Sequence, residues 1–506
     1  MGQKEAGDQN IYQSIGVEPI INCRGTFTII GGSVERPEVL EAMDAASGYF
    51  VQYDELAEAV GKRLAEITGA EWGLISAGCA AGMKHITAAC VTGGNPEKLI
   101  RIPDLTGMDK TQVIAPRYSR NAYDHAVRNI GVEMVMVETP EELEMAINPK
   151  TAMIYLTAGG GSATGQPLSL EVIAEIARPK KIPIMIDAAA EDLTIPNVHL
   201  ERGANVVTYS GGKALCGPQC AGLVLGDKDL LMSAWQASAP HHGPGRDDKI
   251  GKEEIMGMLA AVEAWVTRDH KAEWQVWLSY LDLIATRVES IGGVTTRVEE
   301  PRGLSNHAPA LRISWDPSAL HITGEEVAED FARKTPRIAV GSGGEDGLTS
   351  INITPNQMQP GNAEVVAERV YQILSEERSP KSTELAPAGA DIDGHWDVTV
   401  EFFSGTGRHQ LFLQQDGNWI EGTHESDFSS QGIAGTIEAN EVKLRSEMRR
   451  PGNGITFIFS GKIEGGTISG TVFLGEYLKA TFTAEKSSLK GVRRMVAIPG
   501  GQPLAT

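Results

Sequence analysis

Hydrophobic and polar residues follow one pattern before residue 376 and another after residue 390. In the first part, short runs of apolar and β-branched residues are separated by amphipathic stretches of helical length. This alternation predicts a doubly wound α/β sheet with helices on both faces. The predicted strands are residues 72–75, 112–115, 133–137, 152–156, 183–187, 206–209 and 222–225. The predicted helices are residues 38–50, 55–68, 80–90, 141–146 and 170–178.

A longer helical region, residues 252–291, follows the predicted sheet. Its apolar residues recur at helical spacing, which indicates one buried helix face. They are Ile255, Met258, Leu259, Val262 and Trp265. The next residues, 293–375, have the pattern of a smaller α+β unit. Its predicted strands are residues 295–298 and 310–315, and its predicted helices are residues 324–334 and 364–376.

Beyond residue 390 the hydrophobic period changes to two residues. Residues 377–390, rich in Pro, Ala and Ser, have the composition of a linker. Eight short alternating runs, separated by Gly, Asn and Asp, then predict a small antiparallel barrel or sandwich. They are residues 395–402, 409–415, 419–424, 435–439, 441–445, 454–459, 467–473 and 479–484. Because they hold no catalytic constellation, we interpret this all-β domain as a structural or interaction module.

A chain of 506 residues is long enough for about three domains. We predict an N-terminal segment that packs with a small α+β domain, a large sheet domain, a linker, the all-β domain and a tail. Their boundaries are residues 1–50 for the segment, 51–265 for the large domain, 266–376 for the small domain, 377–390 for the linker, 391–486 for the all-β domain and 487–506 for the tail.

The composition disfavours a nucleic-acid partner. Lys and Arg number 45 and Asp and Glu number 66, so the formal net charge is −21. A surface this acidic repels phosphate backbones.

The sequence also indicates where the protein resides. Its first ten residues are polar, and no apolar run reaches the ~18 residues that cross a membrane. Five scattered cysteines make no disulfide framework, which fits a reducing compartment. We therefore expect a soluble, cytoplasmic protein with no membrane partner. We expect no metal site, because Cys216 and Cys220 have no neighbouring pair of His or Cys ligands.

Residues 206–219 carry the clearest chemical signal. A predicted strand ends at Tyr209, and the sequence SGGK that follows ends in Lys213. Two features elsewhere accompany this lysine. Asp187 ends another apolar strand, and a turn rich in Gly and Ala, residues 76–81, joins a strand to a helix.

Together these features fit pyridoxal 5'-phosphate (PLP) as the cofactor. The PLP aldehyde needs a lysine amine for covalent attachment, and we assign this role to Lys213. The ring nitrogen needs a buried carboxylate to stay protonated, and Asp187 fits this need. The phosphate needs N–H groups at a helix N-terminus, which Gly78, Cys79 and Ala80 would supply.

Two further residues would complete the cofactor site. Ser210, three residues before the lysine, could give its hydroxyl to the phosphate, and Ala189 is small enough for the ring to lie over it. A side chain at the carboxyl end of a strand faces the crevice where α/β sheets bind ligands. We therefore expect these residues to meet at one edge of the sheet.

The order of these motifs resembles a known family. The small-residue turn, the Asp-Ala-Ala sequence that begins at Asp187 and the SGGK sequence before Gly217-Pro218-Gln219 are similar to those of fold-type I PLP-dependent enzymes. More narrowly they resemble the selenocysteine synthase (L-seryl-tRNA selenium transferase)-like branch, which includes D-glucosaminate-6-phosphate ammonia-lyase. The resemblance covers about residues 15–375.

The resemblance implies further features of the site. The cofactor would lie in a crevice between a large and a small domain, completed by a second subunit, so a homodimer or larger homo-oligomer is expected. Arg120 or its neighbours would lie near the cofactor ring. Asn22, Arg24 and Thr26 would face the substrate. Arg337 would bind the substrate carboxylate, a role that suits a bidentate guanidinium.

The sequence departs from this branch in two respects. Residues 246–249 read Arg-Asp-Asp-Lys where the branch often has Arg-Pro-Met-Lys, and the two added acids disfavour a phosphate-bearing substrate. The N-terminal helical domain with which selenium transferases grip tRNA is not recognised here, which together with the charge argues against a tRNA substrate.

We therefore predict a PLP-dependent lyase that acts on a small amino acid with a β-leaving group, giving a keto acid and ammonia. An aldolase or a racemase acting on a β-hydroxy amino acid would use the same residues. An alternative of another class is a non-catalytic protein with a PLP-enzyme fold, whose C-terminal domain is a binding module.

Overall fold

The structure, a computed structural model, describes residues 10–382 and 384–488. The chain separates into two compact units, Met1–Pro380 and Lys381–Thr506. The predicted tail, residues 487–506, lies almost entirely outside the described residues. None of the helices in the described ranges is both long enough and apolar enough to cross a membrane.

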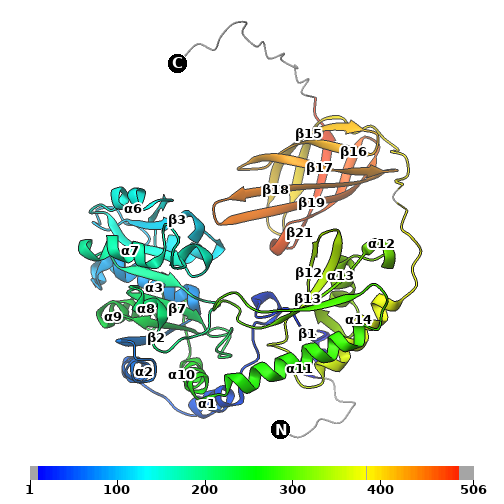
Figure 1. Ribbon diagram of the computed structural model, residues 1–506. Coiled ribbons are helices and arrows are strands. Elements are labelled where there is room, and N and C mark those ends of the chain that lie inside the picture. The colour runs from blue at the N-terminus through cyan, green and yellow to red at the C-terminus, as the bar shows by residue number, and fades with distance from the viewer. Residues whose placement is uncertain (1–9, 383, 489–506) are drawn as a thin grey trace. The chain divides into compact units, whose positions relative to one another are not determined.

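A seven-stranded sheet forms the centre of the first unit, in the order β2-β8-β7-β6-β5-β3-β4 (Figure 1). Only β8 runs antiparallel to its neighbours. All seven predicted strands are present. Their bounds are β2 Trp72–Ser76, β3 Gln112–Pro116, β4 Glu133–Val137, β5 Thr151–Thr157, β6 Ile184–Asp187, β7 Val206–Ser210 and β8 Gly222–Gly226.

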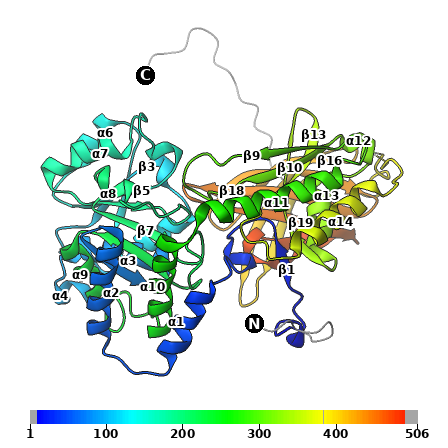
Figure 2. The same ribbon diagram turned by 60° about the horizontal axis from the view of Figure 1, so that its bottom comes forward.

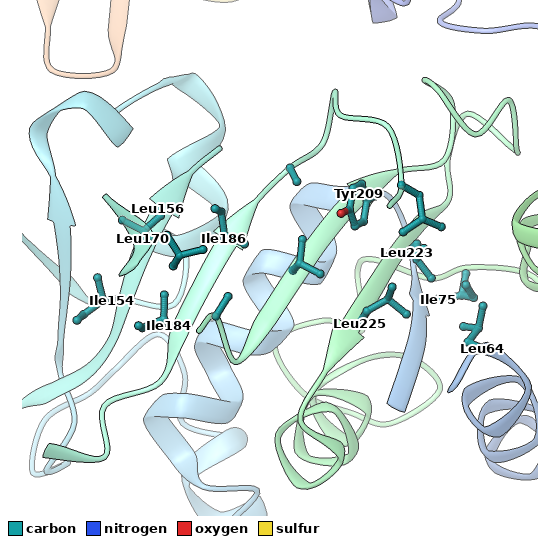
Figure 3. Close-up of a cluster of buried hydrophobic side chains, with 14 of the residues drawn as sticks. Leu64, Ile75, Ile154, Leu156, Leu170, Ile184, Ile186, Tyr209, Leu223 and Leu225 are labelled. Atoms are coloured by element: carbon teal, nitrogen blue, oxygen red, sulfur yellow. The ribbon is translucent and has the colours of Figure 1, made fainter. Parts of the chain in front are cut away.

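Both faces of this sheet are buried, which explains why its strands are almost continuously apolar. In β6, Ile184 and Ile186 belong to one hydrophobic cluster and Met185 belongs to the other. Figure 3 shows the first cluster, in which Ile184 and Ile186 lie with residues from the neighbouring strands. The doubly wound α/β fold predicted from the sequence is confirmed.

Helices cover the two faces of the sheet. Residues of α2, α7 and α10 pack in the first cluster, and residues of α3, α5 and α9 pack in the second. The prediction for residues 38–50 was too long, because the helix ends at Ser47 and Gly48 caps it. The helices in chain order are α1 Pro37–Ser47, α2 Tyr53–Thr68, α3 Cys79–Thr92, α4 Pro96–Leu99, α5 His125–Arg128, α6 Pro140–Ala146, α7 Leu170–Ala177, α8 Val198–Glu201, α9 Lys228–Ala237 and α10 Lys252–Thr267.

The long helical region predicted at residues 252–291 is in fact two helices, α10 and α11 (His270–Val288). Arg268 has an extended backbone and ends α10. Asp269 then caps α11, because its carboxylate accepts hydrogen bonds from the N–H groups of Lys271 and Ala272. The spaced apolar residues end at Trp265, and the break falls in the polar run at residues 267–271, which the prediction of one continuous helical region passed over.

A second, antiparallel sheet has the order β12-β13-β10-β9, and α11, α13 and α14 pack with it in one hydrophobic cluster (Figure 2). A separate two-stranded parallel sheet pairs β1 with β11. Sequence patterns predicted β9, β10, α13 and α14 but missed β1, β11, β12 and β13. The bounds are β1 Ile20–Asn22, β9 Thr295–Glu299, β10 Ala310–Trp315, α12 Pro317–Leu320, α13 Gly324–Arg333, β11 Arg337–Ala339, β12 Gly341–Glu345, β13 Leu348–Ile353 and α14 Asn362–Ser375.

The second unit is a closed antiparallel barrel of the eight strands β14–β21. Each strand pairs with the next, and β21 pairs with β14. Each predicted alternating run forms one strand, and closure leaves no exposed sheet edge. The bounds are β14 Gly394–Glu401, β15 Thr406–Asp416, β16 Trp419–Glu425, β17 Ser430–Glu438, β18 Glu441–Arg450, β19 Asn453–Glu464, β20 Thr467–Phe473 and β21 Lys479–Lys486.

Candidate active site

The carboxyl ends of β2, β6 and β7 bring the predicted cofactor residues to one edge of the large sheet. Asp187 is the last residue of β6, and Ser210 is the last residue of the adjacent parallel strand β7. Lys213 lies three residues after Ser210. Cys79 begins α3 shortly after β2 ends. This edge is where open α/β sheets bind their ligands.

Asp187 is buried, with 6% of its surface exposed, and three neutral groups hold its carboxylate. The backbone N–H of Ala189 donates to Oδ1 at 3.0 Å, and the thiol of Cys79 donates to the same oxygen at 3.4 Å. The hydroxyl of Tyr155 donates to Oδ2 at 3.5 Å. Within the described part of the chain, no ion pair reaches this carboxylate.

Burial raises the pKa of Asp187 above its ordinary value, against the opposing effect of these hydrogen bonds and of the Lys213 charge. A buried acid of this kind gains most from a partner that brings a positive charge. A protonated ring nitrogen is such a partner.

Lys213 lies in the turn after β7, close enough to Asp187 for its charge to lower the pKa of that acid. Its Nζ is 6.0 Å from the centre of the Tyr123 ring. The turn is fixed by the N–H of Cys216, which donates to the carbonyl of Lys213 at 3.0 Å. The structure therefore brings together the lysine and the acid that the sequence singled out, and adds an aromatic ring to them.

The N-terminus of α3 provides the third predicted feature. Gly78 precedes the helix with φ of +86°, a conformation that favours glycine. The first N–H groups of a helix have no partner within it, so those of Cys79 and Ala80 can bind an anion there, assisted by the helix dipole. Ala80 is exposed, whereas the thiol of Cys79 points to Asp187 and to Thr208 Oγ1, 3.1 Å away.

Ala189 and Ser210 lie beside each other at the same edge. The N–H of Ser210 donates to the carbonyl of Ala189 at 3.3 Å, and the N–H of Ala189 in turn contacts Asp187. These two backbone hydrogen bonds hold Ala189 and Ser210 beside Asp187.

Arg120 forms an ion pair with Asp124, which is fully buried and also binds Arg128 at 2.8 Å. Two neighbours of Arg120 in the chain, Asn121 and Tyr123, contact residues of the site. Asn121 donates to Tyr155 and Thr157, and the Tyr123 ring faces Lys213.

The four residues expected to bind substrate come from the N-terminal segment and from β11. Asn22 ends β1, and its Oδ1 accepts the N–H groups of Arg24 and Gly25. Arg24 is exposed and lies over the Phe27 ring. Arg337 begins β11, paired with Ile20. Among the described residues, no hydrogen bond or ion pair joins Asn22, Arg24 or Arg337 to Lys213 or Asp187.

Thr26 lines a cavity of about 630 Å³ together with Ala190 and Ala214, which follow closely after Asp187 and Lys213 in the chain. Trp274 and Trp277 of α11 form part of its wall, with ring centres 5.9 Å apart. Because α11 has the pattern of an ordinary amphipathic helix, the sequence did not indicate that it lines this cavity.

The two acids in the loop before α10 are bound by α3. Lys84 Nζ lies 2.6 Å from Asp247 and 3.0 Å from Asp248, and His85 lies 3.3 Å from Asp248. The negative charge of Asp247 and Asp248 is therefore partly balanced by these side chains of α3. In residues 10–382 and 384–488, no group of three or more His, Cys, Asp or Glu side chains is arranged to hold a metal ion.

Comparisons with known proteins agree with this geometry. Residues 49–268 match the family described as Cys/Met metabolism PLP-dependent enzyme. D-glucosaminate-6-phosphate ammonia lyase of Salmonella typhimurium is 32% identical over 327 residues, covering 63% of this chain and 85% of that protein. 5'-C-glycyluridine monooxygenase-decarboxylase of a Streptomyces species is 27% identical over 375 residues, covering 72% of this chain and 92% of that protein.

A solved structure of D-glucosaminate-6-phosphate ammonia-lyase matches with a TM-score of 0.64 and 28% identity, covering 72% of this chain and 98% of that one. The chain therefore belongs to the family of fold-type I PLP-dependent enzymes that includes this ammonia-lyase, which confirms the resemblance found in the sequence. Its cofactor is PLP. The donor set of the site fits this cofactor, with an amine, a buried acid held by neutral hydrogen-bond donors and a helix N-terminus at one sheet edge.

Proposed function

We propose that the protein is a PLP-dependent lyase that removes a β-leaving group, in the simplest case hydroxyl, from an α-amino acid and releases a keto acid and ammonia. The observation that carries this proposal is the meeting of Lys213, Asp187 and the start of α3 at one sheet edge. The Salmonella relative supports it, because glucosaminate is a 2-amino-3-hydroxy acid and so belongs to the proposed substrate class.

In this proposal each residue of the site holds one part of the cofactor. Lys213 would bind the aldehyde, Asp187 would hold the ring nitrogen, and Ala189 would leave room for the ring. The N–H groups of Cys79 and Ala80 and the hydroxyl of Ser210 would bind the phosphate, with Gly78 allowing the close approach. When bound, PLP supplies the electron sink that accepts the electron pair left at the substrate α-carbon.

Lys213 moves the protons of the reaction. When the substrate amine has taken its place, the free Nζ accepts the proton from the α-carbon. The resulting ammonium would donate a proton to the departing hydroxyl, which leaves as water, and hydrolysis of the released enamine by water would then give the keto acid and ammonia. General acid–base assistance of this kind typically contributes about 10²–10⁴ in rate. As a carboxylate, Asp187 would keep the ring nitrogen protonated.

The remaining site residues position the substrate. Asn22, Arg24 and Thr26 face it, Arg337 binds its carboxylate, and Arg120 orders the segment next to the ring. Thr26 has the most direct support, because it lines the cavity that Ala190 and Ala214 also line.

We propose that the enzyme is a cytoplasmic homodimer, or a larger homo-oligomer, with no nucleic-acid partner. Large apolar side chains between residues 27 and 51 are exposed, among them Ile29 at 80%, Tyr49 at 72% and Phe50 at 102% of their surface. Exposure of this kind is typical of a surface that another protein covers. Sedimentation of the loaded protein tests this assignment, and a monomer at micromolar concentration contradicts it.

A panel of D- and L-β-hydroxy amino acids, including D-glucosaminate and its 6-phosphate, tests the proposed reaction. Ammonia, keto acid and aldehyde are measured together for each compound. Equal amounts of ammonia and keto acid support the lyase. Aldehyde without ammonia identifies an aldolase, inverted substrate alone identifies a racemase, and no reaction together with an unchanged absorption spectrum identifies a non-catalytic protein.

A further inference from the structure

The hydrogen bonds behind Asp187 extend from the acid to a second segment of the chain. Tyr155, in the centre of β5, has none of its surface exposed. Its hydroxyl lies 3.5 Å from Asp187 Oδ2, 3.3 Å from Thr157 Oγ1 and 3.5 Å from Asn121 Nδ2. Burial, together with the charge of Asp187, raises the pKa of Tyr155 well above its ordinary value, so the phenol keeps its proton.

The orientation of Asn121 determines where this proton points. Its Oδ1 accepts the N–H groups of Tyr123 at 2.8 Å and Asp124 at 3.2 Å, which turns Nδ2 toward the sheet. Nδ2 donates to Thr157 Oγ1 at 2.9 Å and also faces Tyr155. Because Asn121 Nδ2 donates an N–H to the phenol oxygen from one side, the phenol proton can point to an acceptor on the other side.

Two acceptors compete for that proton. Thr157 Oγ1 already accepts from Asn121, and its own proton goes to the carbonyl of Ser119 at 3.1 Å. Asp187 carries a negative charge, and hydrogen bonds to a charged acceptor are stronger than those to a neutral one. The phenol therefore donates to Asp187.

We propose that Tyr155 is a positioning residue, which fixes the Asp187 carboxylate toward the cofactor ring nitrogen, and that Asn121 sets the direction of its hydroxyl. Asn121 also caps the short 3-10 helix Ala122–Asp124, so it connects this acid with the Tyr123 ring beside Lys213. The inference rests on the assignment of Asp187 to the ring nitrogen in the proposed function.

Binding of two cofactor forms to the full-length apoprotein tests this inference without any substrate. One is PLP, and the other is its 1-deaza analogue, in which carbon replaces the ring nitrogen. The ratio of the two affinities, measured by equilibrium dialysis, reports the contact between the acid and the ring nitrogen. A residue with a structural role alone changes both affinities equally and leaves the ratio as it was.

Tyr155→Phe is expected to lower the preference for PLP about tenfold or more, the effect of one hydrogen bond to a charged group. Tyr209→Phe is the matched control. Tyr209 is an equally buried tyrosine two strands away, on β7, and its hydroxyl bonds Asn197 at 2.8 Å. This control is expected to keep the wild-type ratio.

Asn121→Asp is the second variant, and it decides the question if Tyr155→Phe does not fold. It keeps the acceptor that caps the 3-10 helix but loses the amide donor, so the ratio should fall about two- to threefold. A wild-type ratio in both variants, or in the one that folds, overturns the inference.

Asp187→Asn separates failure of this inference from failure of the proposed function. If Asp187→Asn abolishes the preference for PLP while Tyr155→Phe keeps it, only the role of Tyr155 is wrong. If Asp187→Asn also keeps the preference, the acid does not face the ring nitrogen and both proposals fail.

Discussion

The thiol of Cys79 lies 3.4 Å from Oδ1 of Asp187, so the first residue of α3 contacts the acid at the end of β6. The same sulfur lies 3.1 Å from Thr208 Oγ1 on β7. Cys79 therefore belongs to two parts of the site, since its N–H group lies at the proposed phosphate end and its side chain lies at the acid. Burial, and then the charge of Asp187, raises the pKa of this thiol well above its ordinary value, so it remains a protonated donor.

This environment predicts an unreactive cysteine, because the thiolate is the form that reacts with alkylating agents. Iodoacetamide should modify the exposed Cys220 of the folded apoprotein well before Cys79. Mass spectrometry of the peptides measures the two rates. Cys79→Ser keeps a donor at this position and should retain most activity, whereas Cys79→Ala should lose about fivefold or more. Faster labelling of Cys79 than of Cys220 would contradict the assigned environment.

Substitution of Asp187 tests the electron sink. Asp187→Ala and Asp187→Asn should fold, since removing an uncompensated buried charge costs the fold little. Their turnover should fall by about 10²-fold or more, the scale of losing one preorganised electrostatic group. Circular dichroism checks the fold and ammonia release checks the turnover. Wild-type turnover in either variant would mean that another group holds the ring nitrogen.

The barrel contains a buried pair of histidines whose ionisation opposes folding. His424 Nε2 and His409 Nδ1 are 3.0 Å apart, and Ser446 Oγ lies 3.0 Å from His424 Nδ1. Burial, and then the charge of His409, lowers the pKa of His424 to about 3. Burial also lowers the pKa of His409. Both rings are therefore neutral in the folded barrel at neutral pH.

The barrel should lose stability in acid. Each histidine binds a proton near its ordinary pKa of 6.5 when unfolded but not when folded. Stability is therefore fully present above about pH 6.5 and falls as the pH drops toward the folded pKa values, by up to about 1.4 kcal/mol per pH unit for each group. Hydrogen exchange of barrel peptides in the full-length protein, from pH 7 to pH 4.5, measures this loss. In His424→Gln, barrel stability should depend less steeply on pH. An equal slope in the variant and the wild-type protein would contradict the assigned role of His424.

The arrangement of Asp187 and Lys213 was predictable because both follow apolar strands. Neighbouring parallel strands end at the same sheet edge, so side chains that follow them meet there. The groups that hold Asp187 were not predictable in this way. Tyr155 and Thr208 lie within apolar runs, and their contacts depend on which strands are neighbours, which the strand pattern does not specify.

The small strands and the break between α10 and α11 were missed for local reasons. β12 contains three glycines in its five residues, so it carries no alternating signal. Its place is determined by pairing with β13. Asp269 is a common helix cap and lies in a polar run, residues 267–271, so the break between α10 and α11 could have been predicted from the sequence.

Reduction of the loaded protein with borohydride tests the central claim most directly. Borohydride fixes PLP to the amine that holds it, and peptide mass spectrometry then identifies the residue. We expect the label on Lys213 alone, together with loss of the visible absorption band of the bound cofactor. Label on another lysine, or an unlabelled protein that still turns over substrate, would contradict the account.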